Sequence, residues 1–309
     1  MLSRRDFGKI ALAGLPLALR AAGDGAVRVG ANTESFHDLA RVPGRDNVND
    51  VIGALKAAGV TEIDLASVNT EAPSPDAGLP PPPPPGPYGG PPAGFTPAEL
   101  AARTRALRNN LRKWRLATPA SHYKELRARF DSAGVEVYAM SFQHDDAFTD
   151  EELEATFGHA KALGVAVISS RATLAMGRRL APFAEKHAIA VAFRNEGETA
   201  AQISALAGIS PRFRVNLDIG NFTAANQEAV AYIQENHQKI THVTVKDRTR
   251  NGGGNEVFGS GDTPIKEVCA LLRDKRYDIR TFVDYEYVGL GTPQEEVRKC
   301  VAYVKAALA

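Results

Sequence analysis

An alternation of apolar and polar residues is clearest in residues 215–222, which read Val-Asn-Leu-Asp-Ile-Gly-Asn-Phe. In an extended chain Asn216 and Asp218 lie on one face and apolar side chains lie on the other, which is typical of a half-buried β-strand. The apolar face consists of Val215, Leu217 and Ile219. The same alternation recurs in residues 189–196 and 240–246. Several strands that bury one face under helices and turn the other toward a common axis predict a barrel.

Predicted strands and helices alternate along the whole chain. We expect strands at 27–32, 61–66, 135–142, 165–169, 189–196, from 215 onward, 240–246 and 281–286. We expect helices at 51–58, from 96–99 onward, 120–132, 149–163, 174–187, 225–236, 264–274 and 293–308. This order predicts an α/β fold, a (β/α)8 TIM barrel in a single domain. A doubly wound open sheet is the alternative, but no glycine-rich phosphate-binding fingerprint follows the first strand.

Residues 1–22 have the pattern of an export signal. A basic start with Arg4 and Arg5 precedes a short apolar run at 10–19, which is too short to span a bilayer. The paired arginines resemble a twin-arginine signal, which carries folded proteins across the bacterial inner membrane. We therefore expect an exported, periplasmic protein whose mature chain, residues 23–309, forms the barrel and has no membrane span.

A proline- and glycine-rich insertion interrupts the barrel pattern at residues 73–95. It contains the unbroken proline run Pro80–Pro85, which cannot donate backbone hydrogen bonds and favours the polyproline II conformation. A solvated loop is one interpretation of this segment. A docking sequence for a domain that binds polyproline II is the other.

The composition narrows the choice of partners. Of the 309 residues, 44% are hydrophobic, and 37 basic side chains balance 36 acidic ones to a net charge of +1. The apolar content suffices for a core, and the charge balance argues against a nucleic-acid or membrane-surface partner. Cys269 and Cys300 lie in predicted helices without metal-ligand spacing, so we expect neither a disulfide framework nor a zinc site.

Charged residues are concentrated on the inward faces of the last four predicted strands. These inward polar residues are Arg194, Glu196, Asn216, Asp218, His242, Thr244, Lys246, Asp284 and Glu286. Buried charges must be paired with each other or bound to a metal. An internal ion-pair network is one explanation, and an active site at the carboxyl ends of the strands is the other.

Several motifs together resemble the sugar phosphate isomerase/epimerase superfamily, the xylose-isomerase-like TIM barrels, and in particular an exported bacterial branch. The motifs are Asp218-Ile219-Gly220, residues 222–226, residues 245–248, residues 258–265 and residues 285–287. The resemblance extends from about Val27 to Leu308. It implies a divalent metal, Mn²⁺, Mg²⁺ or Co²⁺, held by Glu, Asp, His and Glu. It also implies proton transfer between neighbouring carbons of a sugar through an enediolate.

The sequence departs from this family at most of the metal ligands. Asn221 and Thr244 stand where the family has histidines, and Arg194-Asn195-Glu196 replaces a segment with His before Asn. The expected ligands in a rebuilt oxygen site are Asp218, Asp284 and Glu196, a set that suits Mg²⁺ or Mn²⁺ better than zinc. Alternatively, the guanidinium of Arg194 replaces the positive charge of the metal.

The resulting hypothesis is a sugar isomerase- or epimerase-like enzyme that removes a proton next to a carbonyl. Glu196 and Glu286 are the expected acid/base pair, and Lys246 either stabilises oxyanion charge, carries a proton if burial depresses its pKa, or neutralises a carboxylate. The expected substrate contacts are Arg194, Asn221, His242 and Phe258. Trp114 is a further candidate to stack on a sugar ring, and packing in the core or in a lid explains Trp114 and Phe258 equally well.

Two other functions remain open. Elimination from a 3-keto-glycoside begins with the same proton abstraction, and a metal-free barrel that only binds a glycan or a protein partner needs no catalysis. Two further expectations concern residues outside the inward set. His144, after the third strand, is expected in a surface loop, with a place at the mouth of the barrel as the alternative. The basic residues from Arg103 to Arg115 are expected on a solvated helix face.

Overall fold

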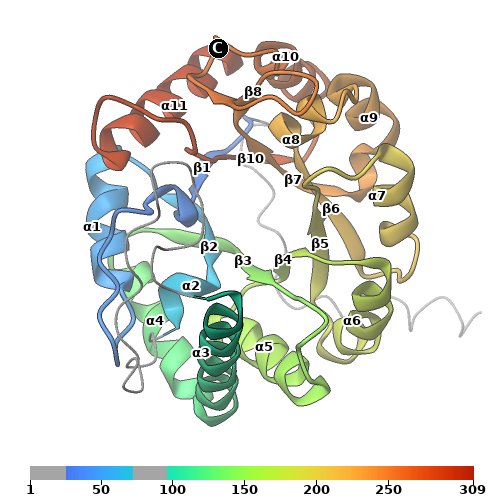
Figure 1. Cartoon of the computed structure of the whole chain (residues 1–309). Coiled ribbons are helices and arrows are strands. Elements are labelled where there is room, and N and C mark those ends of the chain that lie inside the picture. The colour runs from blue at the N-terminus through green and yellow to red at the C-terminus, as the bar shows by residue number, and fades with distance from the viewer. Residues whose placement is uncertain (1–25, 72–95) are drawn as a thin grey trace, which may run out of the picture.

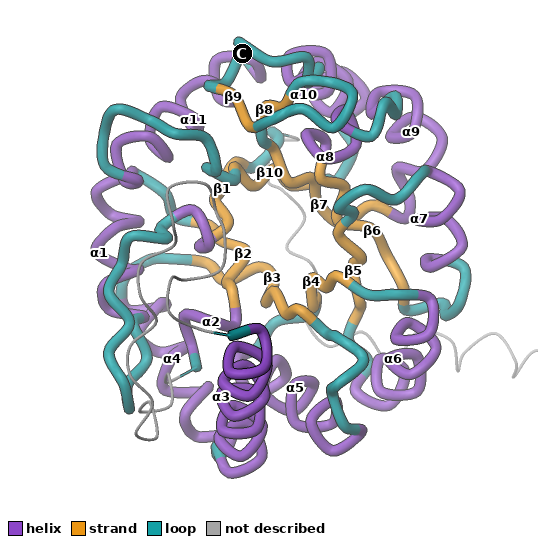
Figure 2. Tube along the Cα trace, viewed as in Figure 1, coloured by secondary structure: helices purple, strands orange, loops and turns teal. Residues whose placement is uncertain are grey.

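Parallel strands close into a barrel in the order β1-β10-β7-β6-β5-β4-β3-β2 (Figure 2). The computed structural model describes residues 26–71 and 96–309. The barrel strands are β1 Val29–Asn32, β2 Glu62–Ala66, β3 Glu136–Gln143, β4 Val167–Arg171, β5 Ala190–Arg194, β6 Phe213–Asp218, β7 Ile240–Val245 and β10 Arg280–Val283. The predicted (β/α)8 barrel is confirmed. The predicted signal at 1–22 and the insertion at 73–95 lie outside the described residues.

Helices surround the ring of strands (Figures 1 and 2). The longer ones are α1 Val48–Ala58, α3 Pro97–Ala117, α4 Ala120–Ser132, α5 Asp150–Leu163, α6 Leu174–His187, α7 Ala200–Ala207, α9 Ala229–Asn236, α10 Ile265–Lys275 and α11 Pro293–Leu308. The short elements are η2 Thr33–Ser35, α2 Ser67–Thr70, α8 Ile219–Ala224, η3 His237–Lys239, and the β8 Asp247–Arg248 and β9 Asn255–Glu256 pair. None of the described helices combines the length and hydropathy needed to cross a membrane.

Local sequence chemistry sets where several helices begin and end. Thr149 caps α5 by accepting a hydrogen bond from the backbone of Glu152, whose side chain accepts one from the backbone of Thr149. The same reciprocal pattern begins α3 at Thr96 and α11 at Thr292. Gly164 ends α5 in the left-handed conformation, which glycine adopts without steric cost.

The main core lies between the barrel and the helices, and polar groups fill the amino-terminal end of the barrel. Arg28 bonds Glu62 at 2.7 Å and Glu136 at 2.6 Å, and Arg280 also bonds both of these carboxylates. Inside the barrel, next to this network, is a small apolar cluster of Tyr138, Ala139, Val167, Ala192 and Phe282. The amino-terminal end is therefore closed, and the carboxyl end is where polar side chains meet a cavity.

Three strands end earlier than the alternation predicts. β5, β7 and β10 end at Arg194, Val245 and Val283, so that Glu196, Lys246 and Glu286 lie on the loops after them. β6 ends at Asp218, and the prediction that Ile219 continues its apolar face is wrong. The Asp218 carboxylate accepts a hydrogen bond from the backbone of Asn221 at 2.8 Å, which caps α8 and stops the strand.

Two helices also differ from the expectation. α7 is not among the predicted helices, although Thr199 and Gln202 form a capping box at its start. α9 begins at Ala229 rather than at residue 225, because α8 uses the preceding residues for its own turn. Both cysteines are free and buried, Cys269 in α10 and Cys300 in α11.

Candidate active site

Arg194 and two carboxylates form a buried cluster at the carboxyl end of the barrel. The last residue of β5, Arg194, donates from Nε and Nη2 to Oδ2 of Asp218, at 3.1 and 2.9 Å. Its Nη2 also donates to Oδ2 of Asp284, which directly follows β10. Burial disfavours the charge of Arg194, but Asp284 and Asp218 outweigh that effect and raise its pKa. The guanidinium is therefore a permanent positive charge.

Lys246 adds a second positive charge to the cluster. Its ammonium lies 3.3 Å from Oδ2 of Asp218 and 2.9 Å from Oε2 of Glu286. Burial alone lowers the pKa of Lys246, but the charges of Asp218 and Asp284 reverse the shift and raise it. The condition for Lys246 to carry a proton, a pKa depressed by burial, is not met. Lys246 instead supplies fixed positive charge next to Glu286.

The carboxylates of this cluster do not fit a divalent metal. Burial raises the pKa of Asp284, but Arg194 and Lys246 outweigh it and lower the pKa, so Asp284 is ionised and paired. One oxygen of Asp218 contacts both cations, and the other caps α8. Glu196 points elsewhere and binds Arg171 at 2.5 Å. Among the described residues, no group of three or more His, Cys, Asp or Glu is placed to hold a metal ion.

The remaining predicted substrate contacts have structural partners. The amide of Asn221 donates to the backbone of Asn195 at 3.0 Å and accepts from Arg248 at 2.7 Å, so it joins two loops. His242 lies deep in the barrel, where its Nδ1 is 2.8 Å from the hydroxyl of Thr241 and its ring packs edge-on against Phe282. Phe258 packs against Tyr287 and Tyr303. These contacts fix all three side chains within the protein.

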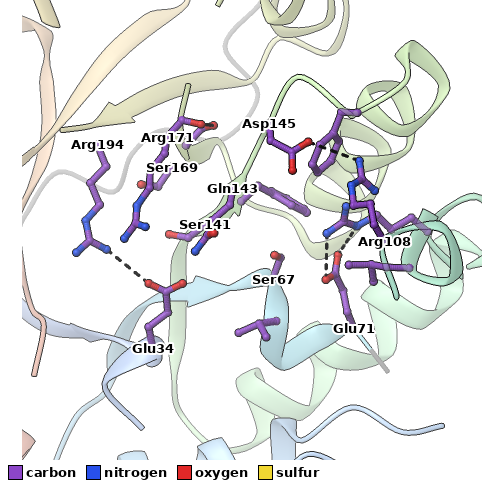
Figure 3. A pocket seen from close by; sticks show the side chains of 16 residues that line it. Glu34, Ser67, Glu71, Arg108, Ser141, Gln143, Asp145, Ser169, Arg171 and Arg194 are labelled. Carbon is purple, nitrogen blue, oxygen red and sulfur yellow. Dashed lines mark hydrogen bonds and ion pairs between the residues drawn. The ribbon is translucent and has the colours of Figure 1, made fainter. Parts of the chain in front are cut away.

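A cavity of about 310 Å³ opens beside Arg194, over the carboxyl ends of β2, β3 and β4. Figure 3 shows its polar side chains converging from several elements. The polar lining consists of Glu34, Ser67, Glu71, Arg108, Arg115, Ser141, Gln143, Asp145, Ser169, Ser170, Arg171 and Arg194. The sequence-based site contains only Arg194 from this set, and neither His242 nor Phe258 lines the cavity. The inward positions Ser141 and Ser169, which are paired in register on β3 and β4, were the available signal.

Helix α3 forms one wall of the cavity and is held there by ion pairs. Arg115 bonds the buried carboxylate of Glu71 at 2.6 and 3.2 Å. Arg108 bonds Glu152 of α5 at 2.7 and 3.1 Å, and Arg112 bonds the same carboxylate at 2.8 Å. The expectation of a solvated basic face is therefore wrong for this part of α3, because these guanidiniums turn toward the buried carboxylates of Glu71 and Glu152.

Glu34 is the carboxylate that faces Arg194 across the cavity edge (Figure 3). It lies in the η2 turn directly after β1, and Asn32 fixes this turn by accepting from the backbone N–H of Glu34 at 2.8 Å. Its Oε2 is 3.6 Å from Nη1 of Arg194, and its side chain is 30% exposed. Burial, followed by the charge of Asp284, raises the pKa of Glu34.

Asp247, which follows Lys246 in the sequence, has an anchoring role. Its carboxylate accepts backbone hydrogen bonds from Gly259 at 2.7 Å, Gly261 at 3.0 Å and Thr263 at 3.2 Å. A Cβ on Gly261 would lie 2.4 Å from Oδ1 of Asp247, so a side chain there would push the loop away. The two residues therefore have different roles: Lys246 contacts the charged cluster, and Asp247 anchors the loop that contains Gly259 and Gly261.

His144 is buried, contrary to the expectation of a surface loop. Its Nδ1 lies 2.8 Å from the hydroxyl of Ser170, and its ring packs against Phe142 and Phe148. Burial lowers its pKa to about 3, so the ring is neutral at physiological pH. Trp114 is partly buried: it packs edge-on against His122 at the border of the main core and is absent from the cavity lining.

Comparisons with known proteins agree with this architecture. The structure of a sugar phosphate isomerase/epimerase from Parabacteroides distasonis is similar to this one, with a TM-score of 0.61 and 13% sequence identity. The match covers 94% of this chain and 98% of that protein. An L-ribulose 3-epimerase covers 91% of the chain and 94% of its own length, with a TM-score of 0.59 and 13% identity. The match with the 3-keto-D-glucoside 4-epimerase of E. coli covers 91% of this chain and 99% of that protein, with a TM-score of 0.58 and 12% sequence identity.

At these identities the similar structures establish the fold alone. The sequence matches no curated protein. The model of the xylose isomerase-like TIM barrel family matches residues 93–307, which is most of the chain. This protein therefore belongs to the xylose isomerase-like TIM barrel family.

Proposed function

We propose that this protein catalyses proton transfer at a carbon next to the carbonyl of a sugar, with Arg194 in the role that the family resemblance implies for a metal. The observation that carries the proposal is the placement of Arg194. Its guanidinium is fixed by Asp218 and Asp284 at the edge of a cavity, with Nη1 directed to the cavity side near Glu34. A pre-oriented cation at this place stabilises the oxyanion that forms when the neighbouring carbon loses its proton.

The cavity lining supports a carbohydrate substrate. Its volume of about 310 Å³ is at the small end of ligand sites, which suits a single sugar unit. Ser67, Ser141, Gln143 and Ser169 present hydroxyl and amide groups that both donate and accept hydrogen bonds, as sugar hydroxyls require. The printed names of several similar structures, isomerases and epimerases of sugars, point to the same class.

Glu286 is the proposed acid/base group on the side of Lys246. Its side chain is 35% exposed, and the ammonium of Lys246 lies 2.9 Å from Oε2. A carboxyl group at this place can accept a proton from carbon and return it, while the ammonium of Lys246 holds the group in position. Glu196 stays the second predicted group, although its side chain is 54% exposed and its ion-pair partner is Arg171.

Elimination from a 3-keto-glycoside is the second candidate reaction. It begins with the same proton abstraction. The similarity to a 3-keto-D-glucoside 4-epimerase is the specific observation that favours a 3-keto sugar as the substrate. The two reactions differ in their later steps, because elimination also expels the group on the next carbon. Product analysis therefore separates them once proton abstraction has been observed.

Isotope exchange in D2O tests the proposal directly. We expect the wild-type protein to introduce deuterium next to the carbonyl of at least one of four probes: L-ribulose, L-xylulose, 3-keto-D-glucose and 3-keto-D-galactose, monitored by NMR. Arg194→Lys keeps a charge but loses the two-sided contact with Asp218 and Asp284, so exchange should fall by roughly 10²-fold.

Two controls accompany this experiment. Melting temperatures show whether the Arg194→Lys protein is folded, and Glu125→Gln on the exposed face of α4 makes a charge change far from the cavity. Absence of exchange with all four probes would contradict the proposal. Sugar binding without exchange would favour the glycan-binding barrel instead.

A further inference from the structure

Glu34 differs from the other carboxylates of the cavity in how it is bonded. Glu71 accepts two hydrogen bonds from Arg115, and Asp145 accepts one from the backbone of Ala147. Within the described part of the chain, no protein donor lies within hydrogen-bond distance of the Glu34 carboxylate, and the ion-pair contact with Arg194 spans 3.6 Å. Its backbone is nevertheless held firmly by the Asn32 cap. Glu34 is thus a positioned carboxyl group whose oxygens are available to a ligand in the cavity.

The two ends of the Arg194 guanidinium lie near two different glutamates. Nη1 is 3.6 Å from Oε2 of Glu34, which comes from the turn after β1. Nη2 is 3.8 Å from Oε1 of Glu286, which comes from the loop after β10. The Arg194 guanidinium therefore lies between the two carboxyl groups, and Glu34 is the one of them that lines the cavity. Glu196 has no such relation to Arg194, since its ion pair is with Arg171.

We propose that Glu34 is a catalytic acid/base group that works with Glu286 on opposite faces of the substrate carbon. This inference rests on the proposed function and replaces Glu196 in the pair expected from the sequence. Inversion at a carbon requires a group that removes a proton from one face and a group that delivers a proton to the other. Glu34 and Glu286 are the two partly exposed carboxyl groups that flank the proposed oxyanion site.

The proton transfer balances without any further reactant. Glu34 takes the proton from carbon, the C–H electron pair forms a carbon–carbon double bond, and the carbonyl π electrons move to the oxygen that faces Arg194. Glu286, in its protonated form, then gives a proton to the opposite face, and the carbonyl is restored. Both side chains are partly exposed, at 30% and 35%, so each carboxyl group recovers its starting state by exchange with water.

The surroundings of Glu34 make it a stronger base than an ordinary glutamate. Burial and the charges of Asp284 and Asp64 raise its pKa, while Arg194 and Arg171 lower it by less. These groups come from β2, β4, β5 and the segment after β10, so they include the charged neighbours on the elements around the cavity edge. A carboxylate with a raised pKa is a stronger base toward a carbon acid than an ordinary surface carboxylate.

Glu34→Gln, Glu286→Gln, Glu196→Gln and the exposed control Glu125→Gln provide the test. They are compared on the four D2O exchange probes, which form two epimer pairs: L-ribulose with L-xylulose, and 3-keto-D-glucose with 3-keto-D-galactose. We expect Glu34→Gln to lower epimerisation by roughly 10²-fold or more. Exchange should persist from one epimer of the pair and disappear from the other, because Glu286 still serves its own face. Glu286→Gln should show the opposite preference.

The outcomes separate the two proposals. Wild-type protein without exchange on any probe defeats the proposed function, and the role of Glu34 falls with it. Wild-type exchange that Glu34→Gln leaves intact in both directions overturns the role of Glu34 alone, as does a loss confined to Glu196→Gln. If Glu34→Gln does not fold, Glu34→Asp replaces it. Its rate should be reduced for one epimer only, and an equal reduction for both epimers would overturn the inference.

Discussion

At the scale of single residues, the most consequential position is Arg194. It is the cation that lies where the family resemblance predicts a metal, and it contacts both Asp218 and Asp284. Bringing Mn²⁺ to these carboxylates would place a divalent ion against a buried guanidinium that already neutralises them. Removing the guanidinium would instead leave two buried carboxylates without their main partner, a situation that favours metal uptake.

We therefore expect wild-type protein, dialysed first against EDTA and then against Mn²⁺, to retain far less than one ion per chain. Arg194→Gln should retain more than the wild type, because Asp218 and Asp284 lose their main cation. Metal analysis by mass spectrometry measures both. One equivalent in the wild type that disappears in Asp218→Ala would restore the metal site expected from the resemblance and remove the guanidinium from its proposed role.

Residue patterns predicted one half of the site and missed the other. The alternation of the late strands predicts that five charged residues face inward together, and the structure places these five in one connected cluster. They are Arg194, Asp218, Lys246, Asp284 and Glu286. The early strands contribute single hydroxyls and an amide, and the inward positions of Ser141 and Ser169 are a weak signal, because such residues occur everywhere in proteins. Glu34 lies in a short turn, where neither helical nor strand periodicity indicates the direction of a side chain.

At the scale of elements, the contacts of α3 explain why its role escaped sequence analysis. Arg108 and Arg112 reach Glu152 across 44 and 40 positions, and Arg115 reaches Glu71 across 44. No local pattern records such pairs, whereas capping boxes and alternation depend on residues a few positions apart. The order of the barrel strands was therefore predictable. The basic face of α3, which forms one wall of the cavity, was instead predicted to be exposed to solvent.

The α3 contacts also predict an acid-sensitive element. Burial raises the pKa of Glu152, but hydrogen bonds from Arg108 and Arg112 outweigh it and bring the pKa to about 2. A carboxyl group with a depressed pKa stabilises the fold above its ordinary pKa near 4.5, and this stability is lost as the pH falls toward 2. The contribution is roughly 1 to 3 kcal/mol, since partly exposed arginines are screened by water.

Glu152→Gln should therefore lower the free energy of unfolding at pH 7 and have a much smaller effect at pH 2.5. Urea unfolding at both pH values measures the difference, with Glu125→Gln as the control for an exposed helix carboxylate. A destabilisation of equal size at both pH values would mean that Glu152 acts through packing or the α5 cap rather than through its charge.

At the scale of the whole molecule, the first residues predict a destination for the folded barrel. Replacing Arg4 and Arg5 by Lys should leave the precursor in the cytoplasm, because a twin-arginine receptor reads this pair. Fractionation of expressing bacteria, with immunoblotting for precursor and mature forms, measures the effect. Substitution of Lys9 instead should leave export unchanged. Export that persists without the two arginines would indicate the general secretory route.

The ion pairs at the amino-terminal end of the barrel join parts of the chain that are made far apart in time. Arg280 meets Glu62 across 218 positions, and β10 pairs with β1 to complete the ring. Until β10 has been made the ring cannot close, and the acids at residues 62 and 136 lack Arg280. Contacts of such long range form slowly, because the loop entropy is lost before they are made. A chain truncated before residue 280 would therefore be unable to close the ring and would be prone to pair its strand edges with those of other chains.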